Sequence, residues 1–243
     1  AGRLVNSGDG NTCLGANAGD GIQSGNNNVA VGYESIQNLV GGSENTAVGK
    51  AAGNALSSGS DNTFVGYMAG ATSNGTYNVC VGSLAGANGS GNHNISIGYY
   101  SNWLGGSNTV AIGQNTLTRG NSQSGSIGIG YYAGYNNAAN YSVYIGYESG
   151  YGQGTVPYTT GENNVGIGYQ SLYSIISGEN NTALGRKSGY SLTTGSNNII
   201  IGNDAEASSV SASNEITFGN TAITKVRIPG INVVLKDNGG TPT

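Results

Sequence analysis

The segment Asn28-Val29-Ala30-Val31-Gly32-Tyr33-Glu34-Ser35 decides the fold, because it recurs one repeat later as Asn45-Thr46-Ala47-Val48-Gly49-Lys50-Ala51-Ala52. Aligned on its glycine, the unit appears thirteen times, at Gly15, Gly32, Gly49, Gly66, Gly82, Gly98, Gly113, Gly130, Gly146, Gly168, Gly185, Gly202 and Gly219. Successive glycines lie 15–17 residues apart, except for one interval of 22 residues. A fixed period of this kind indicates a stacked repeat architecture.

The residues just before each coil glycine predict a short strand. The immediately preceding residue is always large and apolar, as at Val31, Val48 and Val65, and the residue two positions earlier is Thr, Val or Ile. The residue between them varies widely. Alternation of β-branched residues is typical of a strand. We therefore expect the large flanking residues to form an inward column and the variable residue to face outward.

Two further columns accompany the strand. A small residue (Ala, Ser or Thr) stands three positions after the glycine, which indicates close backbone approach. Asn stands four positions before it in nine of the thirteen units, including Asn28, Asn45 and Asn62. Asn accommodates turn conformations, and amides stacked at one coil spacing can form a hydrogen-bonded ladder. We therefore expect three aligned columns to be structural: the glycines Gly32, Gly49 and Gly66, the valines Val31, Val48 and Val65, and the asparagines Asn28, Asn45 and Asn62.

These columns predict an all-β parallel β-solenoid spanning residues 1–219, in which each coil contributes two short strands and glycine-rich corners. At about 4.8 Å per coil, thirteen coils make a rod roughly 60 Å long. So thin a coil buries little apolar area, and association of several chains about a parallel three-fold axis would add to it. Residues 220–243 break the period and are expected to form a β cap or transition segment with a flexible end.

Composition excludes several classes of protein. Of 243 residues, 45 are Gly and 16 are Tyr, while 8 basic and 12 acidic residues give a net charge of −4. Such a chain offers no basic surface for nucleic acid. No apolar run approaches the length of about 20 residues that spans a membrane, so we expect no membrane insertion. Regular Val, Ile and Tyr positions argue against disorder.

The repeat resembles the left-handed trimeric β-roll of YadA-like adhesin heads, and its longer, Gly/Asn/Tyr-rich form is more similar to bacteriophage tail fibres and their receptor-binding tips. The resemblance covers about residues 8–219. It implies a left-handed coil in a parallel homotrimer, located in a virion tail fibre with other virion tail proteins as neighbours. The implied role is adhesion, without chemistry or cofactor, to a bacterial surface polysaccharide or outer-membrane protein. Two alternatives stay open: a bacterial trimeric adhesin head at the cell surface that binds host matrix, and a polysaccharide-depolymerising tailspike.

Reactive side chains are few. Cys13 and Cys80 occupy one column four coils apart, which is too far for a disulfide. His93 lacks a neighbouring acid or Ser at motif spacing, so neither a catalytic triad nor a zinc site is expected. Two carboxylate pairs, Glu44 with Asp61 and Glu162 with Glu179, would stack between adjacent coils. We weigh three interpretations of these pairs: carboxylates solvated in turns, a cation site, and glycosidase-like catalysis.

Aromatic residues are the receptor-binding candidates. Six tyrosines directly follow a coil glycine: Tyr33, Tyr67, Tyr99, Tyr131, Tyr147 and Tyr169. The 22-residue interval holds an insert, positions 150–159, that is expected to bulge as a loop carrying Tyr151 and Tyr158. Trp103 follows Tyr99 and Tyr100 near a coil corner. Such rings either pack against each other or bind a receptor, and for the second role we single out Tyr99, Tyr100, Trp103, Tyr147, Tyr151 and Tyr158.

Overall fold

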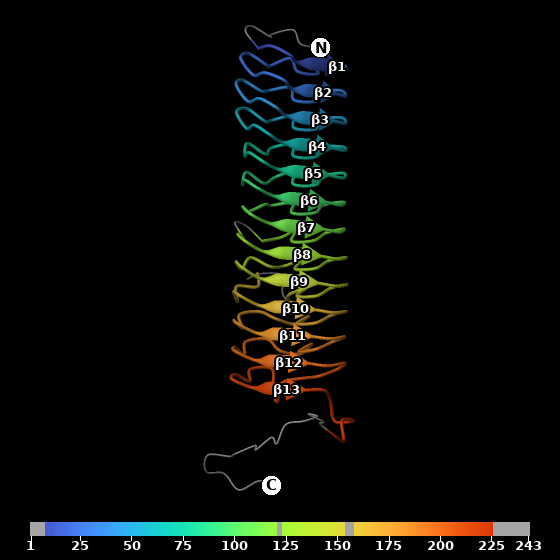
Figure 1. The fold of residues 1–243 in the computed structure, drawn as a ribbon, viewed down its shortest axis with the longest axis vertical. Helices are drawn as coiled ribbons and strands as arrows, with labels where there is room; N and C mark the ends of the chain where they lie inside the picture. Colours follow the sequence, from blue (N-terminus) through green and yellow to red (C-terminus); the bar gives the residue numbers. More distant parts are fainter. Residues whose placement is uncertain (1–7, 121–122, 154–157, 226–243) are drawn as a thin grey trace, which may run out of the picture.

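The computed structural model describes residues 8–120, 123–153 and 158–225. Within these ranges there is no helix, and every coil contains one strand of three residues (Figure 1). The strands are β1 (Thr12–Leu14), β2 (Val29–Val31), β3 (Thr46–Val48), β4 (Thr63–Val65), β5 (Val79–Val81), β6 (Ile95–Ile97), β7 (Val110–Ile112), β8 (Ile127–Ile129), β9 (Val143–Ile145), β10 (Val165–Ile167), β11 (Thr182–Leu184), β12 (Ile199–Ile201) and β13 (Ile216–Phe218). The expectation of two strands per coil is therefore wrong, because the rest of each coil consists of turns.

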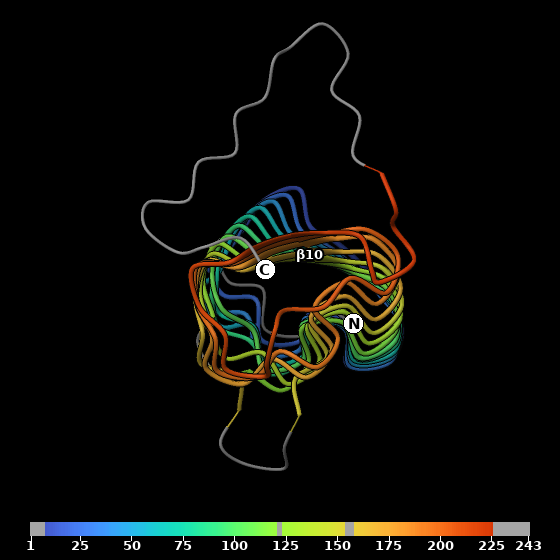
Figure 2. The same ribbon diagram turned by 90° about the horizontal axis from the view of Figure 1, so that it is seen from below.

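The strands form one parallel sheet in chain order from β1 to β13. Each strand pairs with the next in the register of the repeat, so Val31 lies beside Val48 and Val48 beside Val65. Figure 1 shows the strands stacked one below another along the long axis, and Figure 2 shows the coils superimposed as a ring. The predicted parallel β-solenoid is confirmed, with one strand per repeat.

The predicted direction of the strand side chains is reversed. The variable central residue faces inward, and from β2 to β12 it is buried, as for Ala30, Ala47 and Phe64. The flanking residues face outward: Val48 and Val65 are 38% and 37% exposed. Alternation separates two faces without saying which one is inside. The strand centre has to fit the side chains of the turns that share the interior, so its size varies from coil to coil, whereas the large β-branched residues lie on the outer face.

Two other columns add to the core that the strand centres begin. The small residue three positions after the coil glycine is fully buried in every coil where it occurs, from Ala18 to Ala205. A second column, seven positions after the glycine, supplies the large aliphatic side chains, all with no exposed surface: Ile22, Leu39, Leu56, Ile175 and Leu192. This column did not emerge from the sequence analysis. Its gap in the middle of the rod separates two apolar clusters, one between Ala18 and Ala85 and one between Ala133 and Ala205.

The Asn ladder is confirmed. The Asn45 side-chain amide donates to Oδ1 of Asn28 at 3.0 Å, and Asn62 donates to Asn45 at 2.9 Å. The same amides also reach forward to a carbonyl of the following coil, as from Asn45 to Gly59 at 2.9 Å. Because these Asn side chains are buried, each amide satisfies backbone groups that have no other partner.

The insertion is shorter than expected. Gly150 N–H donates to the Ser171 carbonyl and Gly152 N–H to the Tyr173 carbonyl, so this part of the insert keeps the path of a regular coil. Thr159 pairs with Asn137 and returns the chain to the ring. In Figure 2 the chain leaves the ring on both sides of positions 154–157, which lie outside the described residues. At the C-terminal end, positions 220–225 contain no strand, and most of the expected cap, 226–243, also lies outside the described residues.

Candidate aromatic binding surface

A first tyrosine ladder lies directly after the strands in the C-terminal half of the rod. The Tyr131 and Tyr147 rings stack at 5.1 Å between centroids, and Tyr147 stacks on Tyr169 at 5.3 Å with 12° between the planes. These rings are 39–44% exposed. In the N-terminal half the same column contains Tyr33, Lys50 and Tyr67, with the Lys50 ammonium 5.8 and 5.9 Å from the two ring centroids. Only the C-terminal part of the predicted column is therefore a ring stack, and Tyr99 of the same column packs on Tyr100 instead.

A second ladder stands five positions after the coil glycine. Tyr135 stacks on Tyr151 at 5.4 Å, Tyr151 on Tyr173 at 5.1 Å, and Tyr173 on Tyr190 at 5.0 Å. A cation lies over each terminal ring: Arg119 is 4.9 Å from the Tyr135 centroid, and the Lys187 ammonium is 5.1 Å from that of Tyr190. The sequence analysis missed this ladder, although its positions relative to Gly130, Gly146, Gly168 and Gly185 carry the signal.

Tyr132 joins the two ladders. Its ring contacts Tyr131 edge to face at 4.4 Å and Tyr135 at 4.6 Å. Eight tyrosines thus form one aromatic surface over the coils of β8 to β11: Tyr131, Tyr132, Tyr135, Tyr147, Tyr151, Tyr169, Tyr173 and Tyr190. Stacked rings of this kind hold each other in place, so a ligand would meet a rigid surface.

Several hydroxyls of this surface have a raised pKa. Partial burial is the largest cause that raises the pKa of Tyr147, Tyr151 and Tyr173, and the Glu148 carboxylate adds to it. Gln170 Nε2 holds that carboxylate by donating to Oε2 at 2.8 Å. Tyr147, Tyr151 and Tyr173 therefore present neutral hydroxyls that can donate and accept hydrogen bonds.

Next to the ladders lies a pocket of about 440 Å³. It brings together four of the sequence-predicted residues, Tyr99, Tyr100, Trp103 and Tyr158, with Arg119. The Trp103 ring packs on Tyr100 at 4.6 Å, and Tyr100 packs edge to face on Tyr99 at 4.6 Å. Four successive coils contribute to the lining, which explains how residues more than fifty positions apart meet.

The other two predicted residues lie outside this pocket. Tyr147 is the middle ring of the first ladder, and Tyr151 is part of the second ladder and not of a bulged loop. The expectation that Tyr151 lies on the insertion loop is wrong, because backbone hydrogen bonds keep Gly150 and Gly152 in the regular coil. Tyr158 directly precedes Thr159, which pairs with Asn137, and it lines the pocket.

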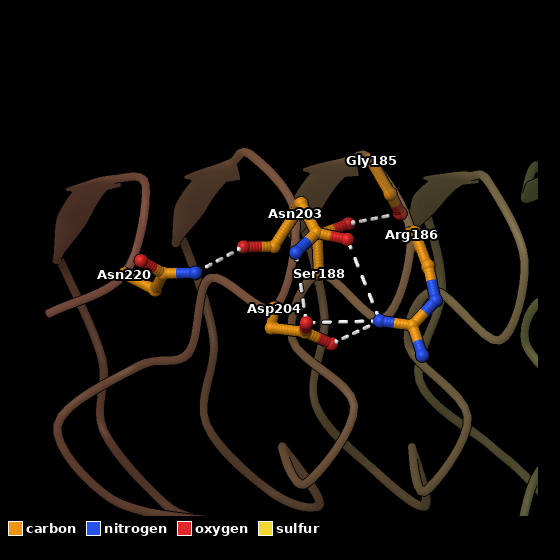
Figure 3. A network of polar contacts seen from close by, with 6 residues as sticks. All are labelled: Gly185, Arg186, Ser188, Asn203, Asp204 and Asn220. Carbon is orange, nitrogen blue, oxygen red and sulfur yellow. Dashed lines mark hydrogen bonds and ion pairs between the residues drawn. The ribbon is translucent and has the colours of Figure 1, made fainter. Parts of the chain in front are cut away.

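Beyond Tyr169 the first ladder changes to a polar network (Figure 3). Arg186 pairs with Asp204 at 2.8 Å, and Asn203 Nδ2 donates to Asp204 Oδ2 at 2.8 Å. Asn220 Nδ2 extends the network by donating to the Asn203 carbonyl at 2.9 Å. Because both charged side chains are about half exposed, this ion pair contributes at most about 1 kcal/mol.

The remaining candidates lie apart from the aromatic surface. Cys13 and Cys80 are free thiols at the centres of β1 and β5, as their column predicts. His93 is exposed and stacks on Tyr77 at 5.0 Å. Glu44, Asp61 and Glu179 are exposed in turns, and Glu162 accepts a hydrogen bond from Asn140 at 2.7 Å. Among the described residues, no group of three or more His, Cys, Asp or Glu side chains could hold a metal ion.

The described part of the chain has no helix with the length and apolar character needed to cross a lipid bilayer. Comparisons with protein-family models, with curated proteins and with solved structures found no match to this chain.

Proposed function

We propose that this chain is a segment of a bacteriophage tail fibre, in which three parallel copies of a left-handed β-solenoid form a rod that adheres to a receptor on the bacterial surface. The role is mechanical and adhesive, without catalysis or cofactor. Neighbouring segments would be other virion tail proteins. The two parts of this proposal, association and adhesion, rest on different faces of the coil.

The observation that carries the proposal is the outer face of the sheet. In every described strand the two outward residues are Thr, Val, Ile, Leu or Phe, and none is charged or strongly polar. Many of these side chains are more than a third exposed in the single chain, including Ile95 at 39%, Ile97 at 38% and Leu184 at 46%. The strip they form runs the length of the sheet, roughly 60 Å.

Soluble monomers seldom expose so long an apolar strip. Covering it with the same strip of other copies would bury the β-branched residues and supply the apolar burial that the thin core lacks. Because the strip is straight and repeats at each coil, copies aligned in parallel about a three-fold axis would match it coil for coil.

The aromatic surface supports the adhesive role. Tyrosines that pack against each other lose little conformational entropy when a ligand binds, and each offers an apolar ring with a polar hydroxyl. A bacterial surface polysaccharide presents both C–H faces and hydroxyls, so it fits this surface. An outer-membrane protein loop is the other receptor of the proposal.

Adhesion is tested with fluorescently labelled purified protein on a panel of bacterial strains and on their isolated surface polysaccharides. We expect saturable binding to a subset of strains, and a loss of at least about tenfold in affinity for the double variant Tyr147→Ala/Tyr169→Ala. The variant Tyr77→Ala is the matched control, because Tyr77 stacks on His93 away from the ladders. Absence of binding to every strain, together with binding to host matrix proteins, would contradict the proposal and favour an adhesin head.

A further inference from the structure

We infer that the pocket between Trp103 and Tyr135 is a binding site for one acidic sugar residue, whose carboxylate contacts the Arg119 guanidinium. This inference rests on the proposed function and names the chemistry of its receptor. The pocket volume, about 440 Å³, lies within the range of sites for small molecules, about 300–1,000 Å³.

The aromatic wall of the pocket is held in place by the coils around it. Trp103 packs on Tyr100, and the Thr118 hydroxyl donates to the Tyr100 carbonyl at 2.9 Å. The Asn115 N–H donates to the Tyr99 carbonyl at 2.9 Å, and the Asn88 N–H donates to the Trp103 carbonyl at 3.0 Å. These hydrogen bonds fix the backbone that carries the rings, and the Trp103 ring, packed on Tyr100, suits the C–H face of a pyranose.

The cation of the pocket is prepared for a carboxylate. The backbone N–H of Arg119 donates to the Tyr135 carbonyl at 3.0 Å, and the Arg119 guanidinium lies 4.9 Å from the Tyr135 ring centroid. Stacking on the ring leaves the edge of the guanidinium, which carries the N–H donors, free to form a paired contact with a carboxylate. The described residues that line the pocket include no Asp or Glu, and no described carboxylate forms an ion pair with Arg119.

The remaining lining residues match a sugar better than a purely apolar ligand. Asn115, Thr118 and Tyr158 place amide and hydroxyl groups around the aromatic wall. Tyr158 reaches the pocket from the one long interval of the repeat, which gives the insertion a role in binding. A neutral sugar would use the rings and these polar groups, whereas an acidic sugar would also use Arg119.

The test is ligand-observed NMR titration of the full chain with methyl glycosides of glucuronic, galacturonic and N-acetylneuraminic acid. Methyl glucoside and methyl galactoside are the neutral controls. We expect at least one acidic glycoside to bind about tenfold more tightly than the neutral ones. The variant Arg119→Gln should lose this preference, and Trp103→Ala should lose binding of both kinds of glycoside.

Lys187→Gln is the matched control, because it removes a cation that also lies over a tyrosine ring but outside the pocket. It should retain the preference for the acidic glycoside. Equal binding of acidic and neutral glycosides, an unchanged preference in Arg119→Gln, or no binding of any glycoside would overturn the inference. Adhesion to cells and the mass of the assembly are measured separately, so saturable adhesion without glycoside binding would reject the pocket while leaving the proposed function in place.

Discussion

Each coil turns at a glycine in a backbone conformation that other residues rarely adopt. From Gly15 to Gly202 the φ angle of this coil glycine is between 127° and 139°. A Cβ added at Gly66 would lie 2.6 Å from the Gly82 carbonyl oxygen of the next coil. Conformation and space therefore both require glycine in this column.

Replacement of Gly66 by Ala tests this requirement. The positive φ and the contact with the next coil should lower the free energy of unfolding by about 2 kcal/mol or more. The control is Gly41→Ala, since a Cβ at Gly41 has its nearest neighbour, Ser24 Oγ, at 3.5 Å. Thermal unfolding followed by circular dichroism measures both variants. Equal midpoints would show that the coil glycine is replaceable.

Inside the coil, large and small residues alternate so that their volumes fit together. Phe64 fills the space left by Gly70, where a Cβ would lie 2.4 Å from the Phe64 ring, and Tyr144 fills the space left by Gly150 in the same way. Where the strand centre is small, as at Ala30, the corresponding position holds the buried Ile36. A change at one member of a pair is thus expected to require a change at the other.

A buried thiol gives the rod a pH dependence. Burial is the main cause that raises the pKa of Cys80 from 9.0 to about 12. An acid whose pKa is higher in the folded state holds its proton longer there than in the unfolded state. Its contribution is constant below pH 9 and falls with rising pH between about 9 and 12.

The variant Cys80→Ala isolates this contribution, because Ala occupies the same position in β2 and β3. Between pH 8 and pH 10, the unmodified protein should lose about 1.4 kcal/mol more unfolding free energy than the variant does. Urea unfolding at the two pH values measures it. A difference independent of pH would mean that Cys80 is accessible to water in the folded state.

At the scale of the element, the Asn ladder ties neighbouring coils together. The Asn62 N–H donates to Asn45 Oδ1 at 3.1 Å, and Asn45 Nδ2 donates to the Gly59 carbonyl at 2.9 Å. Where Asn is replaced in the middle of the rod, hydroxyls continue the contact: the Thr109 hydroxyl donates to Asn94 Oδ1 at 2.6 Å, and Ser142 Oγ accepts from the Asn164 N–H at 3.2 Å. The side-chain contact between neighbouring coils is therefore kept at these positions without Asn.

Replacement of Asn45 by Ala should destabilise the protein by about 2–4 kcal/mol, because the buried Asn62 N–H and Gly59 carbonyl both lose their partner. Asn38→Ala is the control, since the Asn38 amide makes an exposed hydrogen bond to the Asn54 carbonyl. Its effect should stay within about 0.5 kcal/mol. Chemical unfolding distinguishes the two, and a small loss for Asn45→Ala would mean that water replaces the ladder.

The outer face of the strands makes a prediction about association. Ile97 is the last residue of β6 and its side chain is 38% exposed, so Ile97→Lys should leave the single chain folded. If copies associate through this face, the ammonium would be buried without a partner, and the assembly should dissociate. Asn88→Lys adds the same charge at an exposed turn and should not change the mass. Sedimentation velocity measures both, and an unchanged mass for Ile97→Lys would exclude this face as the interface.

Much of the element scale could be predicted from the sequence, because the signals are periodic. The position of each strand follows from Val31 and its equivalents, and the ladder follows from Asn28, Asn45 and Asn62. The side of the sheet that faces inward could not be predicted, since alternation of side chains is symmetric and the buried residue, Ala30, is smaller than the outward Val29 and Val31 beside it. The sequence singled out Trp103 and Tyr158 separately, but their meeting in one pocket with Arg119 could not be predicted, because it depends on how successive coils stack.

At the scale of the whole molecule, the two faces of the rod have different chemistry. The strand face is apolar and uncharged over the whole sheet, whereas the aromatic surface is confined to the coils of β8 to β11 and the adjacent pocket. Scarce charge fits both features, since stacking identical positions about 4.8 Å apart would otherwise align like charges. A uniform face suits association along the rod, and a local surface suits recognition at one place on it.

The central claim is that the strand face is covered by two further copies of the chain. Sedimentation equilibrium of the purified protein at micromolar concentration tests it most directly. The account predicts a single species with three times the 24.3 kDa mass of the chain, unchanged on dilution. A folded species with the mass of one chain, soluble and stable at the same concentration, would contradict it.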